Sequence, residues 1–193
     1  MIRALLSCAV VALSVGLALI AGCASAHGPY TPPTEGSRDT VKAQELTRKA
    51  VGCLDSDPAK SESLLREALT ADLFFAPAHN DLGILFLRRG ELYSAAEEFE
   101  WAKKLTPGNP EPRVNLALTL EKAGRVDDAL SAYASALEVC TQYMPAMQGK
   151  ARLEVKSGRS DENTHALLRE IAMAGESERW REWARGQLAK SVP

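Results

Sequence analysis

The sequence lacks a large excess of charge of either sign. With 23 basic and 25 acidic side chains among 193 residues, the formal net charge is −2, so the chain has no basic surplus of the kind that binds nucleic acid. Apolar residues make up 46% and charged residues 25% of the chain, which excludes a mostly disordered protein and a protein with many membrane spans. We therefore expect a folded body and no nucleic-acid partner.

Signature motifs of common catalytic and nucleotide-binding sites are also missing. The chain contains no G-x-x-x-x-G-K-[ST], H-E-x-x-H, G-x-S-x-G or G-x-G-x-x-G. Its three histidines, His27, His79 and His165, are scattered, and no C-x-x-C indicates a metal or redox site. We therefore expect no catalytic residue, no metal site and no cofactor, and we interpret the chain as a protein that is not an enzyme.

The first 22 residues have a composition of their own. Arg3 precedes an apolar run from Leu5 to Ile20, and small residues follow it, which is the layout of a secretory signal. The run is short for a transmembrane helix, which needs about 20 apolar residues. An ordinary cleaved signal and an uncleaved anchor are two interpretations of this segment.

A third interpretation comes from the end of this run and the cysteine that follows it. Ile20-Ala21-Gly22-Cys23 resembles the lipobox of bacterial lipoproteins. In that family the bond before the cysteine is cut and the cysteine carries the acyl chains. The resemblance therefore implies that residues 1–22 are a lipoprotein signal peptide and that Cys23 is the lipidation site.

The resemblance also implies a location. Where Asp after the modified cysteine retains a lipoprotein at the inner membrane, Ala24 implies passage to the periplasmic face of the outer membrane. Stable anchoring needs more than one acyl chain, and the two or three chains that such families carry meet that need. We expect a lipid-anchored protein of the bacterial envelope, bound to the membrane through its anchor.

Residues 23–38 predict a tether between the anchor and a folded domain. Residues 24–38 contain three prolines, two glycines and no apolar periodicity, which is typical of a flexible linker. Such a linker reaches roughly 50 Å when fully extended and about 20 Å on average. The tether would hold the body, residues 39–193, just off the membrane.

Beyond Asp39 the apolar residues recur at helical spacing, and no segment alternates as a strand does. Capping residues support this pattern: Asp57 precedes Pro58, Asn109 precedes Pro110, and Ser160 and Ser177 each precede acidic residues. We expect an all-α protein with helices at 40–54, 58–71, 76–89, 92–105, 110–123, 126–140, 144–156, 161–174 and 177–190.

The helices repeat at a constant interval of 34 in the numbering. Three sets of positions share this spacing: Gly90, Gly124 and Gly158; Gly83, Ala117 and Ala151; Leu65, Phe99, Tyr133 and Leu167. A period of 34 with paired helices resembles the tetratricopeptide repeat (TPR). The resemblance implies a TPR helical solenoid of three to four repeats, with units at 42–75, 76–109, 110–143 and 144–177 and a capping helix at 177–190.

The repeat pattern assigns packing roles to several other residues. His79 stands at a position where this family usually has an aromatic residue, so we expect it to pack. Cys53 and Cys140 fall two to three repeats apart, and because a disulfide needs Cα atoms within about 7 Å, we expect free thiols. Trp180 and Trp183 lie on one face of the last helix, as core of the end cap or as a partner-docking surface.

TPR arrays bind peptides or helices on the concave surface formed by the first helix of each repeat. Carried over to this chain, the resemblance places the groove at Leu46, Ala50 and Cys53; at Asn80, Ile84, Leu87 and Arg88; at Val114, Asn115, Leu118 and Glu121; and at Gln148, Arg152 and Val155. Its centre is apolar, which favours an apolar helix or extended segment. Only Asn115 matches the carboxylate-clamp type of TPR domain, so we do not expect recognition of chaperone tails.

Together these patterns predict an adaptor or assembly scaffold that binds envelope proteins or peptide segments. The alternative is a structural envelope protein that self-associates as a homo-oligomer through its groove or its tryptophan cap. The sequence names neither the partner nor the pathway.

Overall fold

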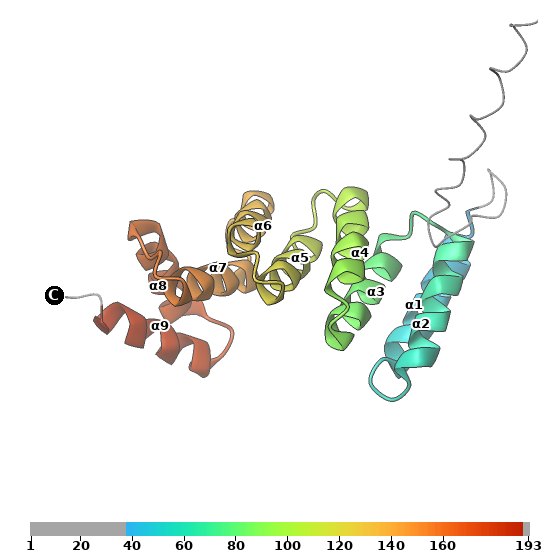
Figure 1. Cartoon of the computed structure of the whole chain (residues 1–193), viewed down its shortest axis with the longest axis horizontal. Coiled ribbons are helices and arrows are strands. Elements are labelled where there is room, and N and C mark those ends of the chain that lie inside the picture. The colour runs from blue at the N-terminus through green and yellow to red at the C-terminus, as the bar shows by residue number, and fades with distance from the viewer. Residues whose placement is uncertain (1–37, 191–193) are drawn as a thin grey trace, which may run out of the picture. The chain divides into compact units, whose positions relative to one another are not determined.

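The structure is a computed structural model that describes residues 38–190. The predicted signal peptide, the lipidation site Cys23 and the tether up to residue 37 lie outside the described residues, as do 191–193. The described part contains nine helices and no strand (Figure 1), and none of its helices is long and apolar enough to cross a membrane. The helices are α1 (Thr40–Cys53), α2 (Pro58–Ala71), α3 (Ala76–Arg89), α4 (Leu92–Leu105), α5 (Glu111–Lys122), α6 (Val126–Val139), α7 (Met144–Lys156), α8 (Glu162–Ala174) and α9 (Glu178–Lys190). Each agrees with its predicted range to within one residue at either end.

The helices stack as antiparallel pairs. The pairs α1–α2, α3–α4 and α5–α6 pack most closely, and each pair is joined to the next through its second helix. Neighbouring first helices (α1 and α3, α3 and α5, α5 and α7) also contact one another, whereas the described second helices do not do so to a comparable extent. The first helices therefore form the inner row of a curved stack, and the second helices form the outer row.

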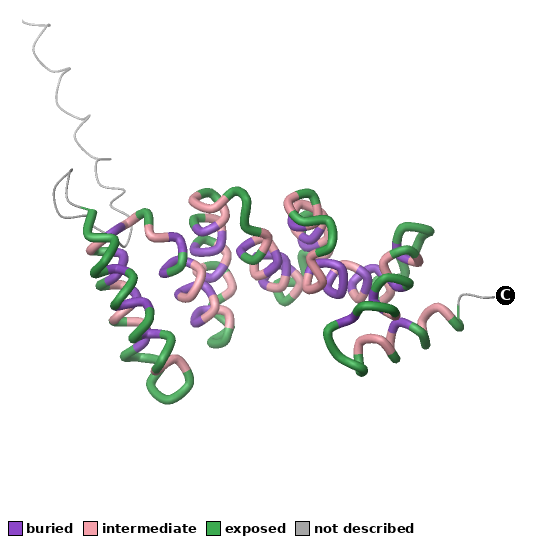
Figure 2. Tube along the Cα trace, turned by 180° about the vertical axis from the view of Figure 1, so that it is seen from behind, coloured by how far each residue is buried: buried purple, intermediate pink, exposed green. Residues whose placement is uncertain are grey.

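The core is divided among the repeats (Figure 2). Leu65, Phe99 and Tyr133, one per outer helix at the predicted spacing of 34, are fully buried. Alanines at 68, 102 and 136 are buried beside them. A single helix pair cannot bury such residues by itself, so each repeat depends on its neighbours for stability.

The large rings pack against glycines. A Cβ atom added to Gly83 of α3 would lie 2.6 Å from the ring of Phe99 in the partner helix α4. In the next repeat Tyr133 of α6 turns to Gly149 of α7 instead, where an added Cβ would overlap its ring. The ring of Tyr133 therefore packs against the following repeat, whereas the ring of Phe99 packs within its own.

Glycines also end three inner helices. Gly124 follows α5 with φ +76°, and Gly90 and Gly158 have the same left-handed backbone. The residue after each glycine donates its N–H to a carbonyl one helical turn back, from Arg125 to Leu120 at 2.9 Å for example. This 6→1 bond is the Schellman motif, which favours glycine because a Cβ is strained there. The glycine period of 34 therefore has a backbone cause.

The predicted helix cap at Asp57 is confirmed, whereas the one at Asn109 is wrong: Pro110 is the N-cap of α5, and the Asn109 side chain accepts from the N–H of Glu111 at 3.0 Å. The Asp57 side chain accepts from the N–H of Lys60, with Pro58 as the first residue of α2. The prediction of Ser160 as a cap is wrong, since Asp161 caps α8 and forms a reciprocal capping box with Thr164. A capping box needs a side-chain acceptor three residues after the cap. Asp161 has Thr164 at this spacing, and the Thr164 hydroxyl accepts from the N–H of Asp161.

His79 is fully buried in α3 and packs, as predicted. Its ring stacks on Trp101 of α4, with 5.6 Å between ring centroids. Its Nδ1 lies 2.7 Å from the buried carboxylate of Glu98, and its Nε2 lies 2.8 Å from the carbonyl of Leu73. Because a carbonyl can only accept, Nε2 carries a hydrogen, and His79 joins α3, α4 and the α2–α3 connection.

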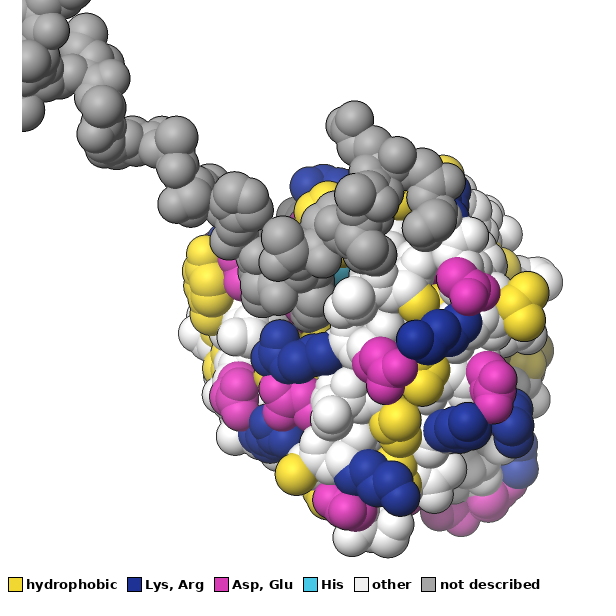
Figure 3. All heavy atoms as spheres, turned by 90° about the vertical axis from the view of Figure 1, so that its right-hand side faces the viewer, with side chains coloured by type: hydrophobic (Ala, Val, Ile, Leu, Met, Phe, Trp, Pro, Cys, Tyr) yellow, Lys and Arg dark blue, Asp and Glu magenta, His cyan; other side chains and the backbone are white. Residues whose placement is uncertain are grey.

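The two ends of the stack differ. At the C-terminal end, α9 packs on a cluster of Met147, Ala151, Leu168, Ile171 and Ala184, against which Trp180 and Trp183 lie partly buried. The rings of the two tryptophans meet edge to face at 5.3 Å. At the N-terminal end, charged side chains of both signs are interspersed over α1 and α2 (Figure 3), with ion pairs such as Lys42–Glu67 at 3.1 Å. Polar end faces of this kind keep a repeat array soluble.

We predict opposite effects for two glycine-to-alanine substitutions. Gly124→Ala should lower the free energy of unfolding by about 1–2 kcal/mol, because alanine is strained at positive φ. Gly52→Ala, in the helical backbone of α1 with open space around it, should raise it by about 0.5–1 kcal/mol. Urea denaturation followed by circular dichroism measures both, and effects of the same sign would contradict this account of the repeat termini.

Candidate functional site

The inner row carries the predicted groove residues, and the structure separates them by accessibility. Leu46, Ala50 and Val114 are buried in the stack, as is Gln148. Arg88 is exposed, and the remaining predicted residues are half-buried: Cys53, Asn80, Ile84, Leu87, Asn115, Leu118, Glu121, Arg152 and Val155. The apolar side chains that a partner could reach on α3 and α5 are therefore Ile84, Leu87 and Leu118.

Two asparagines link α3 to α5 along the inner row, and we call this pair of hydrogen bonds the asparagine ladder. The amide of Asn115 on α5 donates to the side-chain oxygen of Asn80 on α3 at 3.0 Å. Asn80 in turn donates to Glu111, at the start of α5, at 3.2 Å. Thr119 supports the ladder by donating to the carbonyl of Asn115 at 2.8 Å. These polar residues therefore hold α3 and α5 in register.

Beside this ladder, the ionised form of Asp81 is electrostatically disfavoured. Burial and the nearby charge of Glu111 raise the pKa of Asp81 to about 6, against a smaller opposing effect of Asn80. Neither Asp81 nor Glu111 has an ion-pair partner within residues 38–190. The two carboxylates form an acidic centre on the inner row.

Glu121 forms the second polar centre, between α5 and α7. Its carboxylate accepts from Arg152 at 2.6 Å and lies 3.8 Å from Lys156. The hydroxyl of Tyr133 approaches it at 3.5 Å. Burial and the charge of Glu121 raise the pKa of this tyrosine, and Arg152 partly offsets the effect. The predicted residues Glu121 and Arg152 are thus brought together, but as a cross-brace between repeats.

Gln148 marks the end of the ladder. It occupies the position of Asn80 two repeats later, but its Nε2 atom is buried without a partner in the described part of the chain. At the place that corresponds to Asn115, two repeats later, α9 has Trp183. The unpartnered Nε2 of Gln148 is a donor and needs an acceptor, whereas an indole offers only a donor, so Trp183 cannot satisfy it.

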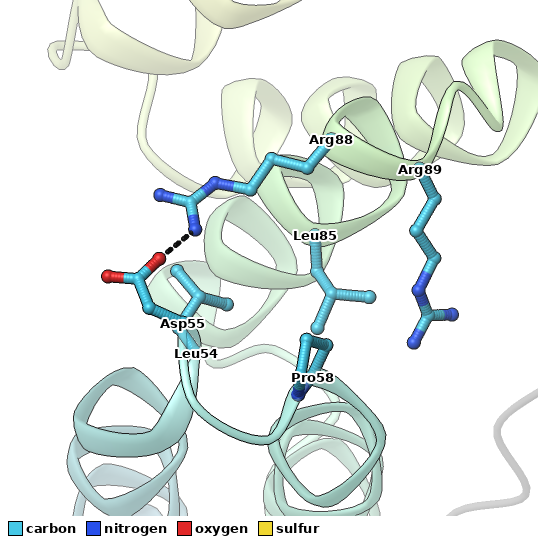
Figure 4. A pocket seen from close by; sticks show the side chains of 6 residues that line it. All are labelled: Leu54, Asp55, Pro58, Leu85, Arg88 and Arg89. Atoms are coloured by element: carbon cyan, nitrogen blue, oxygen red, sulfur yellow. Dashed lines mark hydrogen bonds and ion pairs between the residues drawn. The ribbon is translucent and has the colours of Figure 1, made fainter.

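A pocket of about 270 Å³ lies at the edge of the stack, between the α1–α2 turn and the end of α3. Leu54, Pro58 and Leu85 form its apolar floor, with Leu85 pointing toward Pro58 (Figure 4). Arg88 bends across one side to Asp55 at 2.5 Å, and Arg89 turns to the other side, where it pairs with Glu62 at 2.6 Å. The predicted groove residue Arg88 therefore braces the first two repeats.

Residues 38–190 contain no group of three or more histidine, cysteine, aspartate or glutamate side chains that could hold a metal ion. Cys53 and Cys140 are free thiols.

The sequence pattern did not predict the acidic centre. Asp81 and Asn115 occupy the same position in successive repeats, so the repeat register alone places Asp81 on the inner row. The raised pKa of Asp81 could not be read from that register, because it depends on how far the folded stack buries the side chain and on where Glu111 lies. The pocket was also missed, since its lining comes from a turn and a helix end of two different repeats.

No protein-family model matches the chain. Over 113 residues the chain is 29% identical to a probable UDP-N-acetylglucosamine–peptide N-acetylglucosaminyltransferase, SPINDLY, from Hordeum vulgare. The match covers 55% of this chain and 11% of the barley protein. The chain therefore spans about a tenth of the length of this relative.

Solved structures match a larger share of this chain than the barley protein does. A TPR protein from Parabacteroides merdae is 19% identical, with a TM-score of 0.66 over 78% of this chain and 60% of that protein. The first TPR domain of Spaghetti (RPAP3), solved with an HSP90 peptide, is 13% identical, with a TM-score of 0.59 over 63% of this chain and 98% of that domain. Together with the paired helices and the inner row, these similarities show that the chain has the all-α fold of tetratricopeptide-repeat proteins.

Proposed function

We propose that this protein is a non-catalytic adaptor that binds a segment of a partner protein along its inner row. The observation that carries the proposal is the pairing of an apolar strip, Ile84, Leu87 and Leu118, with the acidic centre, Asp81 and Glu111. An apolar segment with one basic side chain complements both features. The Spaghetti domain bound to an HSP90 peptide supports this use of the fold.

The charge of the inner row separates this proposal from recognition of an acidic tail. The peptide bound to the Spaghetti domain, SRMEEVD, carries three carboxylate side chains near its end. Asp81 and Glu111 would repel such a tail, since like charges across an interface cost several kcal/mol. We therefore propose a partner segment with a lysine or arginine, presented as a helix or an extended strand.

We further propose that the adaptor works at the bacterial envelope, anchored through acylated Cys23 to the periplasmic face of the outer membrane. The Ile20-Ala21-Gly22-Cys23 sequence after an apolar run supports this. An anchor confines the inner row to a thin layer above the membrane, which raises its effective concentration toward envelope partners.

The raised pKa of Asp81 generates a prediction on stability. An aspartate whose pKa is higher in the folded than in the unfolded protein makes no unfavourable contribution at low pH and destabilises the fold as pH rises from about 4 to above 6. Asp81→Asn should therefore raise the free energy of unfolding at pH 7–8 by about 1–3 kcal/mol and leave it nearly unchanged below pH 4. Denaturation over a pH series measures this, with Glu97→Gln on the exposed side of α4 as the control.

The same substitution should have the opposite effect on binding. Asp81→Asn should weaken binding of a lysine-containing segment, because the acidic centre loses half of its charge. A variant that is neither stabilised at neutral pH nor weakened in binding would show that Asp81 has no part in recognition.

The apolar strip is tested by the pair Leu87→Glu and Leu118→Glu. The double variant should lose at least tenfold in affinity for captured segments, since buried anchor residues contribute about 2 kcal/mol or more each, while helix content stays unchanged. Fluorescence anisotropy with labelled segments from a peptide array measures the affinity. Tyr93→Glu, on an exposed residue of α4, is the matched control.

Equal affinity of the folded double variant and the wild type would refute the inner row as the binding face. Light scattering on the same samples tests the alternative occupant, a second copy of the chain. A monomer that still binds segments would exclude self-association as the use of this face.

The anchor is tested by Cys23→Ala. We expect the wild type to float with membrane vesicles prepared from a bacterial host and the variant to appear in the soluble fraction, because the acyl chains are attached through the cysteine. Density-gradient flotation measures the distribution, and equal flotation of both proteins would contradict the lipid anchor.

A further inference from the structure

The point where the chain enters the body is held in place. The guanidinium of Arg38 donates to both carboxylate oxygens of Asp72, at 2.9 and 3.2 Å, and Thr40 donates to the same carboxylate at 2.7 Å. Although burial acts in the opposite direction, these hydrogen bonds hold the pKa of Asp72 below its ordinary value. The start of α1 is thereby fixed to the connection between α2 and α3.

Large apolar side chains are exposed beside this entry point. Phe74 follows Asp72 in the same connection and is 49% exposed, and the guanidinium of Arg38 lies 5.3 Å from the centre of its ring. Val41, in the first turn of α1, is 78% exposed. Exposed apolar side chains of this size are few in the described part of the chain, and these two stand in the first turn of α1 and in the connection to which the start of α1 is fixed.

Trp101 extends the group onto α4. It is 42% exposed and stacks on His79, whose Nε2 is bonded to the carbonyl of Leu73, the residue before Phe74. The ammonium of Lys104 lies 5.9 Å from the Trp101 ring and has no ion-pair partner within residues 38–190. We define the tether-side patch as Arg38, Val41, Phe74, Trp101 and Lys104.

The patch lies on one edge of the stack, at the end of the helices where α5 begins with Glu111, whereas Ile84, Leu87 and Leu118 lie in the later halves of α3 and α5. The start of α1, the α2–α3 connection and the end of α4 that leads into α5 all lie along the upper edge in Figure 1. The Arg88–Asp55 pocket lies at the opposite edge, by the α1–α2 turn. A surface that covers the patch would therefore leave the apolar strip accessible to a partner.

We propose that the tether-side patch rests on the lipid surface to which the protein is anchored. Tryptophan and phenylalanine with adjacent arginine and lysine are the residues that suit a membrane–water interface, with rings among the headgroups and cations at the phosphates. The proposal rests on the lipid anchor of the proposed function.

The length of chain ahead of the body argues for lipid as the occupant. Only a short segment of sequence separates Cys23, the proposed anchor, from Arg38, so the entry point is the part of the body that the chain holds closest to the anchor. Contact through a few side chains is weak for a free protein, but tethering makes it intramolecular and so effective. The tether and the patch together would fix which edge of the stack faces the membrane.

The test uses the full-length lipidated protein in vesicles of phosphatidylethanolamine and phosphatidylglycerol, with part of the lipid brominated on its acyl chains. Bromine quenches only tryptophans at the lipid surface, and the chain has three tryptophans. We expect partial quenching in the wild type and loss of that quenched component in Trp101→Phe, which keeps a ring against His79. Phe74→Ser should reduce the quenching at least twofold, whereas Met173→Ser, on an exposed residue of α8, should leave it unchanged.

Flotation in the same samples separates the inference from the anchor. Protein that floats with the vesicles but shows no quenched component assigned to Trp101 would overturn the inference and leave the anchor intact. Quenching that persists in Trp101→Phe would also overturn it, since the end cap with Trp180 and Trp183 would then face the lipid. Protein that does not float would refute the anchor and the inference with it. Circular dichroism of each variant confirms that the helices are intact.

Discussion

The structure depends on one packing constraint, the contact of a large ring with a helix that has no side chain at the point of contact. Phe99 occupies the space over Gly83, and Tyr133 occupies the space over Gly149. Interiors pack at the density of organic crystals, so a Cβ at either glycine would displace the ring and separate the two helices. Because each ring is buried only when its neighbours are in place, the stability of one repeat is shared with the next.

The spacing of the inner helices follows from this packing, and the chemistry of the inner row follows from the spacing. Once α3 and α5 are close, Asn80 and Asn115 can bond across the gap, and Glu121 can reach Arg152 on α7. The same closeness leaves Asp81 half-buried next to Glu111. A fold selected for stability alone would have little reason to keep that carboxylate, and sites that lower stability are common where a protein binds a partner.

Two surfaces of the stack can then serve separate purposes. The inner row presents an apolar strip and an acidic centre, and the edge where the chain enters presents aromatic and basic side chains. His79 lies beneath the second surface and is also part of the packing between helices. Its ring supports Trp101, and its nitrogens join α3 and α4 to the connection that carries Phe74. Under the two proposals, an adaptor held by this edge would leave its apolar strip uncovered.

The sequence by itself determined the helices, their period and their ends. Amphipathic spacing, Asp57 before Pro58 and a glycine that recurs once per repeat are local signals, since a left-handed backbone after a helix needs glycine in any context. The tertiary structure alone decided that Tyr133 would turn to Gly149, that Asp161 and not Ser160 would cap α8, and that Leu46, Ala50 and Val114 would be buried. It also decided which polar groups would pair and which carboxylate would be left with a raised pKa. The reason is physical: periodicity specifies the direction in which a side chain points, whereas burial, pairing and charge depend on what the neighbouring repeat places opposite it.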